Sequence, residues 1–236
     1  MTTQSTLYDA LVDLISDKVD AIHQSHDMVS VDVAPANLLT VAKQLRDEPS
    51  LRFDALIEVC GVDYSDYGRT YWRTTEATTG GYDRGVMEQS AGEQVVPWDK
   101  PRFAVAYILR SVCHNTVMRM RVYLSMDPPI VASVTGIWPV ADWFEREAFD
   151  LFGIIFDGHP DLRRILTDYG FIGHPFRKDF PLIGHVELRY DEQSQRCVYE
   201  PVSIKPRVLV PKVIRQDSRH LPGHKSHAAK QGVTDE

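Results

Sequence analysis

Two apolar runs in the middle of the chain constrain its fold more than any other feature. In residues 103–109 both alternate sets of positions are apolar, which is typical of a central strand with two buried faces. In residues 118–124 apolar residues alternate with arginine or tyrosine, which indicates an edge or half-exposed strand. Asn115 favours a turn between the two runs, and residues 130–134 offer a further strand. The middle of the chain therefore predicts a β-meander.

Helical patterns precede these strands. Residues 6–23 repeat apolar side chains at helical spacing, residues 29–33 alternate as a short strand, and Pro35 can open a second helix. The apolar face of that second helix is expected to be Leu38, Leu39, Ala42 and Leu45. A third candidate helix carries Phe53, Leu56, Ile57 and Cys60. Helices followed by a meander indicate an α+β fold, with N-terminal helices packed on a small, mostly antiparallel sheet.

The chain divides into three parts by texture. Residues 1–140 form the expected α+β domain, with a flexible insertion at about 73–100 that is rich in Thr, Gly and Gln and lacks periodicity. Residues 141–190 hold a helix and an irregular docking segment. Residues 191–236 are expected to be an extended, partly disordered C-terminal arm.

The C-terminal arm has a distinctive composition. Prolines recur every five residues at 201, 206 and 211, which excludes a regular helix there. Between Lys205 and Lys230 seven basic residues face one acidic residue, Asp217. An apolar, basic arm favours contact with an acidic surface on a partner protein.

Residues 142–153 predict an amphipathic helix. Asp142 has the character of an N-cap with Glu145 as its capping-box partner, and Gly153 is a plausible C-terminal stop. Glu147 falls inside the apolar face, which is formed by Trp143, Phe144, Ala148, Leu151 and Phe152. Arg146 and Asp150 lie on the opposite side, four residues apart, where they can pair weakly.

Three interpretations of Glu147 remain open. The carboxylate reaches water at the margin of the face, or it forms a buried pair with Arg163 or Arg164 that fixes the following segment, or it is a catalytic acid. Glu145 and Glu147 point about 200° apart on a helix, so they cannot serve one site as acid and base. This geometry argues against a stand-alone hydrolase.

The segment after Gly153 is dense in Gly, His, Pro, Asp and Arg. Metal ligands are conceivable, but the spacing of the candidates fits no known motif: Asp157, His159, Asp161, His174 and His185. Nucleotide-binding glycine loops and a nucleophile elbow are absent from the sequence. The three cysteines, at 60, 113 and 197, lie too far apart in the sequence for an iron–sulfur or zinc motif. We therefore expect no catalytic, cofactor-binding or metal-binding residues in this chain.

Aromatic and charged side chains alternate near the end of this segment. Phe171, Phe176 and Phe180 are interspersed with Arg177, Lys178 and Asp179. Such a mixture is enriched at buried protein interfaces. A recognition surface and a compact loop folded on its own core are both compatible with it.

The sequence here resembles a known family, the C subunit of NADH:quinone oxidoreductase, or respiratory complex I. The resemblance rests on Glu145-Arg146-Glu147, Asp150-Leu151-Phe152, His159, Arg163 and Ile165-Leu166, and on the ungapped continuation to about residue 192. It covers roughly residues 30–72 and 101–215. The segment 73–100 departs from the usual pattern as an insertion, and no fused D subunit follows in the chain.

The resemblance implies a non-catalytic structural subunit of the peripheral arm of a proton-translocating enzyme, a translocase. Partner subunits would hold FMN and iron–sulfur clusters, which carry electrons from NADH to a quinone that also acts in partner subunits. The D subunit would be the main contact, with the B and I subunits nearby. An equivalent subunit of a membrane-bound hydrogenase or another quinone-reductase complex is the alternative.

The expected subunit interface consists of the charged residues of the block: Glu145, Arg146, Glu147, Asp150, His159, Arg163, Arg164, Arg177, Lys178 and Asp179. The net charge of −7 argues against a nucleic-acid binder. No apolar run approaches the ~20 residues that cross a bilayer, and the N-terminus lacks signal-peptide features. We expect the cytoplasmic face of a bacterial inner membrane, with membrane association only through the complex.

Overall fold

A five-stranded sheet forms the centre of the molecule. The computed structural model describes residues 3–25, 28–65, 67, 72–74, 86–88 and 98–204. The strand order is β1 (Ala21–Ser25), β2 (Met28–Asp32), β7 (Thr116–Leu124), β6 (Phe103–Ser111) and β3 (Ala55–Asp63). Only the β2–β7 pair is parallel within this sheet. The predicted α+β class with a mostly antiparallel sheet is confirmed.

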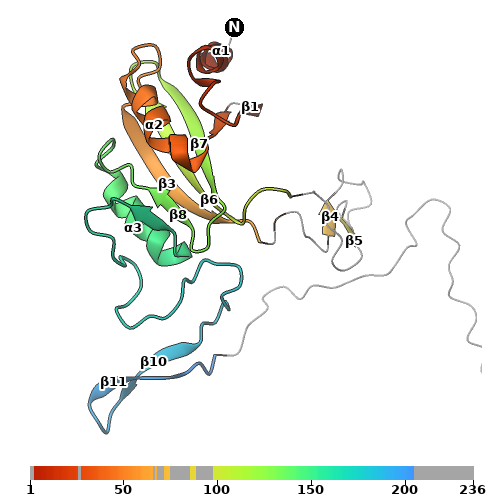
Figure 1. Ribbon diagram of the computed structural model, residues 1–236. Helices are drawn as coiled ribbons and strands as arrows, with labels where there is room; N and C mark the ends of the chain where they lie inside the picture. The colour runs from red at the N-terminus through yellow and green to blue at the C-terminus, as the bar shows by residue number, and fades with distance from the viewer. Residues whose placement is uncertain are drawn as a thin grey trace, which may run out of the picture.

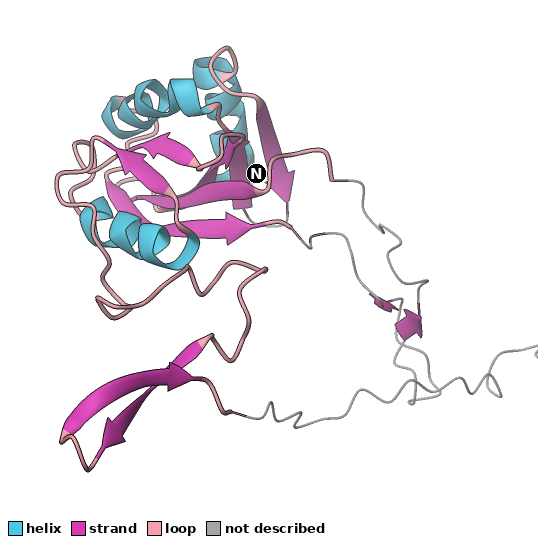
Figure 2. Cartoon of the chain, turned by 60° about the horizontal axis from the view of Figure 1, so that its bottom comes forward, coloured by secondary structure: helices cyan, strands magenta, loops and turns pink. Residues whose placement is uncertain are grey.

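Helices cover one face of this sheet, as Figures 1 and 2 show. They are α1 (Thr3–Ile15), the short 3-10 helix η1 (Pro35–Asn37) and α2 (Leu38–Asp47). The core between the layers is apolar and includes Leu11, Ile15, Leu38, Leu45, Val31, Tyr107, Met118 and Met120, all fully buried. Burial of this apolar surface, at about 25 cal/mol per Å², is the main force that holds the layers together.

The two apolar runs form the neighbouring strands β6 and β7. β6 lies between β7 and β3 and is buried on both faces, as predicted for a central strand. β7 alternates between buried and half-buried residues, as predicted, but it lies inside the sheet between β2 and β6. The arginines of β7 therefore mark a half-exposed face and not an edge.

Two predicted helices were wrong in part or in full. The predicted helix over residues 6–23 ends at Ile15, and residues 21–25 pair with β2 as a strand. The predicted third helix is the strand β3. A bulge between Leu56 and Glu58 shifts the alternation, so that Leu56 and Val59 both face the core. Their spacing of three residues imitates a helical period.

The second helix begins at Pro35 as predicted, but Leu39 is 38% exposed and Val41 takes its place in the core.

The loop after the sheet then leads to a smaller layer beside β3. It consists of β8 (Ile130–Ala132), α3 (Ala141–Phe152) and β9 (Ile155–Asp157), with β8 and β9 paired in parallel. The predicted strand at 130–134 is thus confirmed.

Two hairpins complete the described structure. β4 (Trp72–Thr74) and β5 (Val86–Glu88) pair within the predicted insertion, whose other residues up to 97 lie outside the described part. β10 (Val186–Asp191) and β11 (Arg196–Pro201) form a ribbon that stands apart from the body (Figures 1 and 2). This ribbon crosses the expected boundary at 190/191, and the tail from 205 on lies outside the described residues. No described helix is long and apolar enough to cross a membrane.

Candidate functional site

The helix α3 carries the central residues of the candidate site. It begins at Ala141, after Val140, so Asp142 lies in its first turn and the predicted Asp142 cap is wrong. The Asp142 side chain instead approaches His159, with 3.2 Å between Oδ1 and Nε2. Gly153 ends the helix in the left-handed conformation, with φ of 73°, and its N–H donates to the carbonyl of Phe149. The predicted C-terminal stop is confirmed.

The buried face of α3 differs from the predicted apolar face. Glu145 and Asp150 are fully buried and Arg146 is 8% exposed, whereas Trp143 is 70% exposed. Glu147 is half-buried, which supports the interpretation that it lies at the margin. The structure departs from the pattern because α3 packs on two sides, against β3 and against the polar segment that follows.

Asp150 holds the first half of the segment between β9 and β10, residues 158–185, in place. Its Oδ1 lies 2.8 Å from Arg164, and its Oδ2 accepts the backbone N–H groups of Ile165, Leu166 and Thr167 at 3.1, 2.8 and 2.8 Å. These donors outweigh the desolvation of the carboxyl group and hold the pKa of Asp150 well below its usual range. A buried acid–arginine pair does fix this segment, but its acid is Asp150 and not Glu147.

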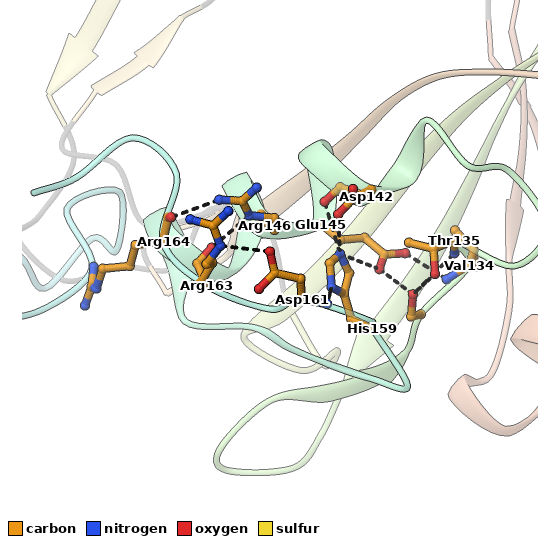
Figure 3. Close-up of polar contacts among 10 residues, drawn as sticks. Val134, Thr135, Asp142, Glu145, Arg146, His159, Asp161, Arg163 and Arg164 are labelled. Atoms are coloured by element: carbon orange, nitrogen blue, oxygen red, sulfur yellow. Dashed lines mark hydrogen bonds and ion pairs between the residues drawn. The ribbon is translucent and has the colours of Figure 1, made fainter. Parts of the chain in front are cut away.

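Arg146 reinforces this attachment without pairing with Asp150. Its guanidinium donates to the carbonyls of Arg163 and Arg164, each at 3.2 Å, as Figure 3 shows. The predicted pair between Arg146 and Asp150 is therefore wrong, since each side chain binds the following segment. Arg163 itself forms an exposed pair with Asp161 at 2.8 Å.

Asp63, at the end of β3, fastens the second half of the segment. Its carboxylate binds Arg102 at 2.9 and 2.7 Å and accepts the N–H groups of Ser65 and Lys178 at 3.0 and 2.9 Å. Arg102 also reaches Asp179 at 3.0 Å. Although burial alone would raise it, the pKa of Asp63 falls to about 2 because these donors favour the charged form.

Arg177 joins the end of α3 to the segment. Its Nε donates to the carbonyl of Phe152 at 2.6 Å, and its guanidinium lies over the ring of Phe103 at 5.0 Å. The Phe176 N–H donates to Leu151, and the Phe176 ring meets Phe152 edge-on. The carbonyl groups left free at the end of α3 are thus satisfied by the segment.

Glu145 forms a separate polar cluster at the N-terminal end of α3 (Figure 3). Its carboxylate accepts the hydroxyl of Ser133 at 2.6 Å and the N–H of Val134 at 2.7 Å. Burial raises the pKa of Glu145, because these bonds offset only part of the lost hydration. The buried His159 side chain lies 4.0 Å away; its Nδ1 accepts the N–H of Asp161, which places a ring hydrogen on Nε2.

Apolar side chains of the same segment face outward. We call Leu166, Tyr169, Ile172, Phe176 and Leu182 the apolar rim; their exposures are 63, 96, 84, 59 and 106%. Phe171 and Phe180 turn towards each other instead, with ring centres 5.8 Å apart. The segment is therefore both a loop fastened to its own core and a presented apolar surface.

The expected interface is corrected on this point. Glu145, Arg146 and Asp150 are buried within the chain, and the charges of Arg164 and Arg177 point to internal partners. Glu147, Arg163, Lys178 and Asp179 keep some exposure. Sequence reasoning named only charged residues because apolar residues in a loop look like core, whereas the exposed surface of the segment also includes the apolar rim.

The buried acidic side chains of the site are committed to contacts within the chain. Among the described residues, no group of three or more His, Cys, Asp and Glu is placed to hold a metal ion. Glu145 and Glu147 diverge, with Glu145 committed to Ser133 and Val134. Each buried carboxylate of the site is occupied by donors of this chain, so the arrangement supports a fastening role.

Sequence reasoning missed Asp63, Arg102 and Ser133. Asp63 is the last residue of β3, a strand that the sequence pattern predicted to be a helix. A correct prediction of this strand would have placed a polar residue at its end, where functional residues often lie. Arg102 precedes the central strand β6. Nothing in the local sequence pairs Asp63 with Arg102 or with Lys178, which lies 115 residues away.

Known proteins resemble this chain over most of its length. A model of the family described as respiratory-chain NADH dehydrogenase, 30 Kd subunit, matches residues 31–186. The C subunit of the NADH-quinone oxidoreductase of Coxiella burnetii is 57% identical over 227 residues, covering 96% of this chain and 100% of that protein. The corresponding proteins of Halorhodospira halophila and Legionella pneumophila are 52 and 49% identical, covering 86 and 94% of this chain and 87 and 96% of their own lengths.

A solved structure described as a trypsin-resistant fragment of Nqo5 is also similar, with a TM-score of 0.47 and 25% identity, covering 66% of this chain and 98% of that fragment. The mixed sheet and the block of α3 and residues 158–185 define a small α+β protein. The chain belongs to the family of the respiratory-chain NADH dehydrogenase 30 Kd subunit.

Proposed function

We propose that this chain acts as the C subunit of a proton-translocating NADH:quinone oxidoreductase, in a structural role and without a catalytic site of its own. The observation that carries the proposal is the block formed by α3 and residues 158–185. The Arg164 side chain binds inward to Asp150 and the backbone N–H of Lys178 binds Asp63, while the apolar rim faces outward. Exposed apolar patches of this kind mark interaction sites.

The family supplies the rest of the proposal. The enzyme moves electrons from NADH through FMN and iron–sulfur clusters, held in partner subunits, to a quinone that acts in partner subunits. The D subunit is the proposed main contact, with the B and I subunits nearby. The chain lies on the cytoplasmic face of a bacterial inner membrane and joins the membrane only through the complex.

A tag on the native chain tests this proposal. Purification from detergent-treated membranes is expected to recover a complex that oxidises NADH and reduces quinone. Recovery of a free monomer with its own enzymatic activity would refute the proposal. A complex that evolves hydrogen and does not oxidise NADH would favour the related hydrogenase.

A single substitution in the apolar rim tests the docking surface. Tyr169→Arg places a charge where an aromatic ring is 96% exposed, so the isolated chain should fold normally. If Tyr169 anchors the contact, its loss costs about 2 kcal/mol, and recovery of the complex falls by more than about tenfold.

The matched control is Val112→Arg. Val112 is also exposed, at 63%, but it lies in the turn between β6 and β7. Both variants are compared by the yield of complex per tagged chain and by the far-UV spectrum of the chain alone. Equal losses of complex in the two variants would count against the apolar rim as a specific surface.

A further inference from the structure

A surface hollow of about 820 Å³ lies at the N-terminal end of α3. Its walls come from α2, from the loop between β8 and α3, and from the turn after β9. The lining is mostly apolar and includes Leu39, Ala132, Ile137, Pro139 and Pro160. A hollow with such a lining suits apolar side chains more than water.

The polar cluster around Glu145 builds two walls of this hollow. Glu145 accepts the hydroxyl of Ser133, which lines the hollow from the loop after β8. His159 sits between that cluster and Asp142, at 3.1 Å from the Asp142 carbonyl, and holds the turn whose neighbour Pro160 lines the other wall. The N-terminal half of α3 thus shapes the hollow, while the C-terminal half fastens the segment that carries the apolar rim.

The charges around the hollow are Asp142, Asp157 and Lys43. Asp157 is exposed, and no ion pair or hydrogen bond of its side chain is formed within the described part of the chain. The Asp142 side chain is 41% exposed and lines the hollow, although its Oδ1 is buried 3.2 Å from Nε2 of His159. Lys43 is exposed and lies one turn from Asp47, whose carboxyl it attracts. The balance at the hollow is therefore negative.

We propose that the hollow is a second docking site, which receives an apolar segment of another subunit with a Lys or Arg side chain set between Asp142 and Asp157. This inference rests on the proposed function, because it assumes a multisubunit complex. The choice of a basic occupant follows from charge: an acidic segment would meet two carboxylates, whereas a basic one would neutralise them. Long basic side chains also lay their methylene stems on apolar surface, as this lining requires.

Photo-crosslinking in the intact complex tests the proposal. Leu39, at 38% exposure on α2, is replaced by p-benzoylphenylalanine in the tagged full chain, and the complex is irradiated and digested. The expected product joins residue 39 to a peptide of another subunit that contains Lys or Arg beside apolar residues. The same replacement at Val112, which does not line the hollow, is the control and should not yield that peptide.

Charge reversal gives a second readout. Asp157→Lys should lower the yield of the residue-39 cross-link by about tenfold, which corresponds to about 1.4 kcal/mol. Asp17→Lys, a reversal on an exposed turn after α1, should leave the yield unchanged.

The outcomes separate this proposal from the proposed function. If a normal complex is recovered but residue 39 gives no cross-link, this inference is wrong and the proposed function stands. A cross-link to the basic residues 205–236 of this chain, or to a peptide without Lys or Arg, also overturns it. If no complex is recovered with the unmodified chain, the proposed function itself fails.

Discussion

Three buried carboxylates show how one functional group has different roles in this molecule. Asp150 and Asp63 are met by an arginine and by backbone N–H groups, and both have a lowered pKa. Glu145 is met by a hydroxyl and one N–H group, and its pKa is raised. The number and charge of the donors thus decide whether burial is offset.

Replacing Asp150 tests the first attachment. Asp150→Asn keeps the shape of the side chain but leaves Arg164 without its counter-ion and turns an amide towards N–H donors. Loss of one partner of a buried pair costs about 3 kcal/mol, so the free energy of unfolding in urea should fall by about that amount.

A milder variant accompanies this prediction. Thr167→Val removes only the hydroxyl that donates to Asp150 at 2.5 Å, and about 1 kcal/mol should be lost. Asp161→Asn is the control, because its pair with Arg163 is exposed and should contribute little. A larger effect at Asp161 than at Asp150 would contradict the assignment of the fastening residue.

The pH dependence of stability tests Asp63. Its folded pKa of about 2 lies below the ordinary value of about 3.9, so its contribution is complete above about pH 5 and is lost as pH falls towards 2. The difference in unfolding free energy between the wild type and Asp63→Asn should reach about 2 kcal/mol near pH 7.

That difference should shrink steadily in urea titrations between pH 5 and pH 3. Glu145 acts in the opposite sense, because an acid with a raised folded pKa costs less stability as it becomes protonated. A difference for Asp63→Asn that stays constant down to pH 3 would show that its carboxylate is not held by Arg102 and the two N–H groups.

At the scale of elements, local sequence patterns predicted most of the central strands and the end of α3. The strands at 29–33, 103–109, 118–124 and 130–134 were predicted from alternation or apolar runs, and Gly153 marked the end of α3. The strand β3 was mistaken for a helix because a bulge altered its period. Contacts such as Asp63 with Lys178 depend on tertiary packing, which no local pattern encodes.

The end of α3 offers a test at this scale. Gly153 has φ of 73°, and a Cβ there would collide with the side chains of Arg177 and His174. Gly153→Ala should therefore lower the free energy of unfolding by about 2 kcal/mol, through backbone strain and displacement of Arg177.

Gly136→Ala is the matched control, because a Cβ at Gly136 would have no heavy atom within 4 Å. Its unfolding free energy should change by less than about 0.5 kcal/mol. Thermal or urea unfolding of both variants checks the prediction. Similar losses in the two would mean that the region tolerates no added methyl group, whatever the backbone conformation.

At the scale of the whole molecule, apolar exposure is concentrated after α3. The ribbon of β10 and β11 has one charged face, with Arg189 paired to Glu200, and one apolar face. The apolar face includes Val186, Leu188, Tyr190 and Tyr199, each between 51 and 57% exposed. An isolated two-stranded ribbon is only marginally stable in water, so this one gains from a surface that covers it.

A double substitution on that face tests whether the ribbon is covered in the complex. Leu188→Ser with Tyr190→Ser removes side chains that are each 57% exposed, so the unfolding free energy of the chain alone should change little. In the complex, the same area would be buried at about 25 cal/mol per Å², so its loss should weaken assembly by more than about tenfold. Glu192→Ser, in the turn of the same ribbon, is the control for a change at an exposed site. Reduced stability of the free chain with normal assembly would place the apolar face inside this protein's own fold and remove it from the docking surface.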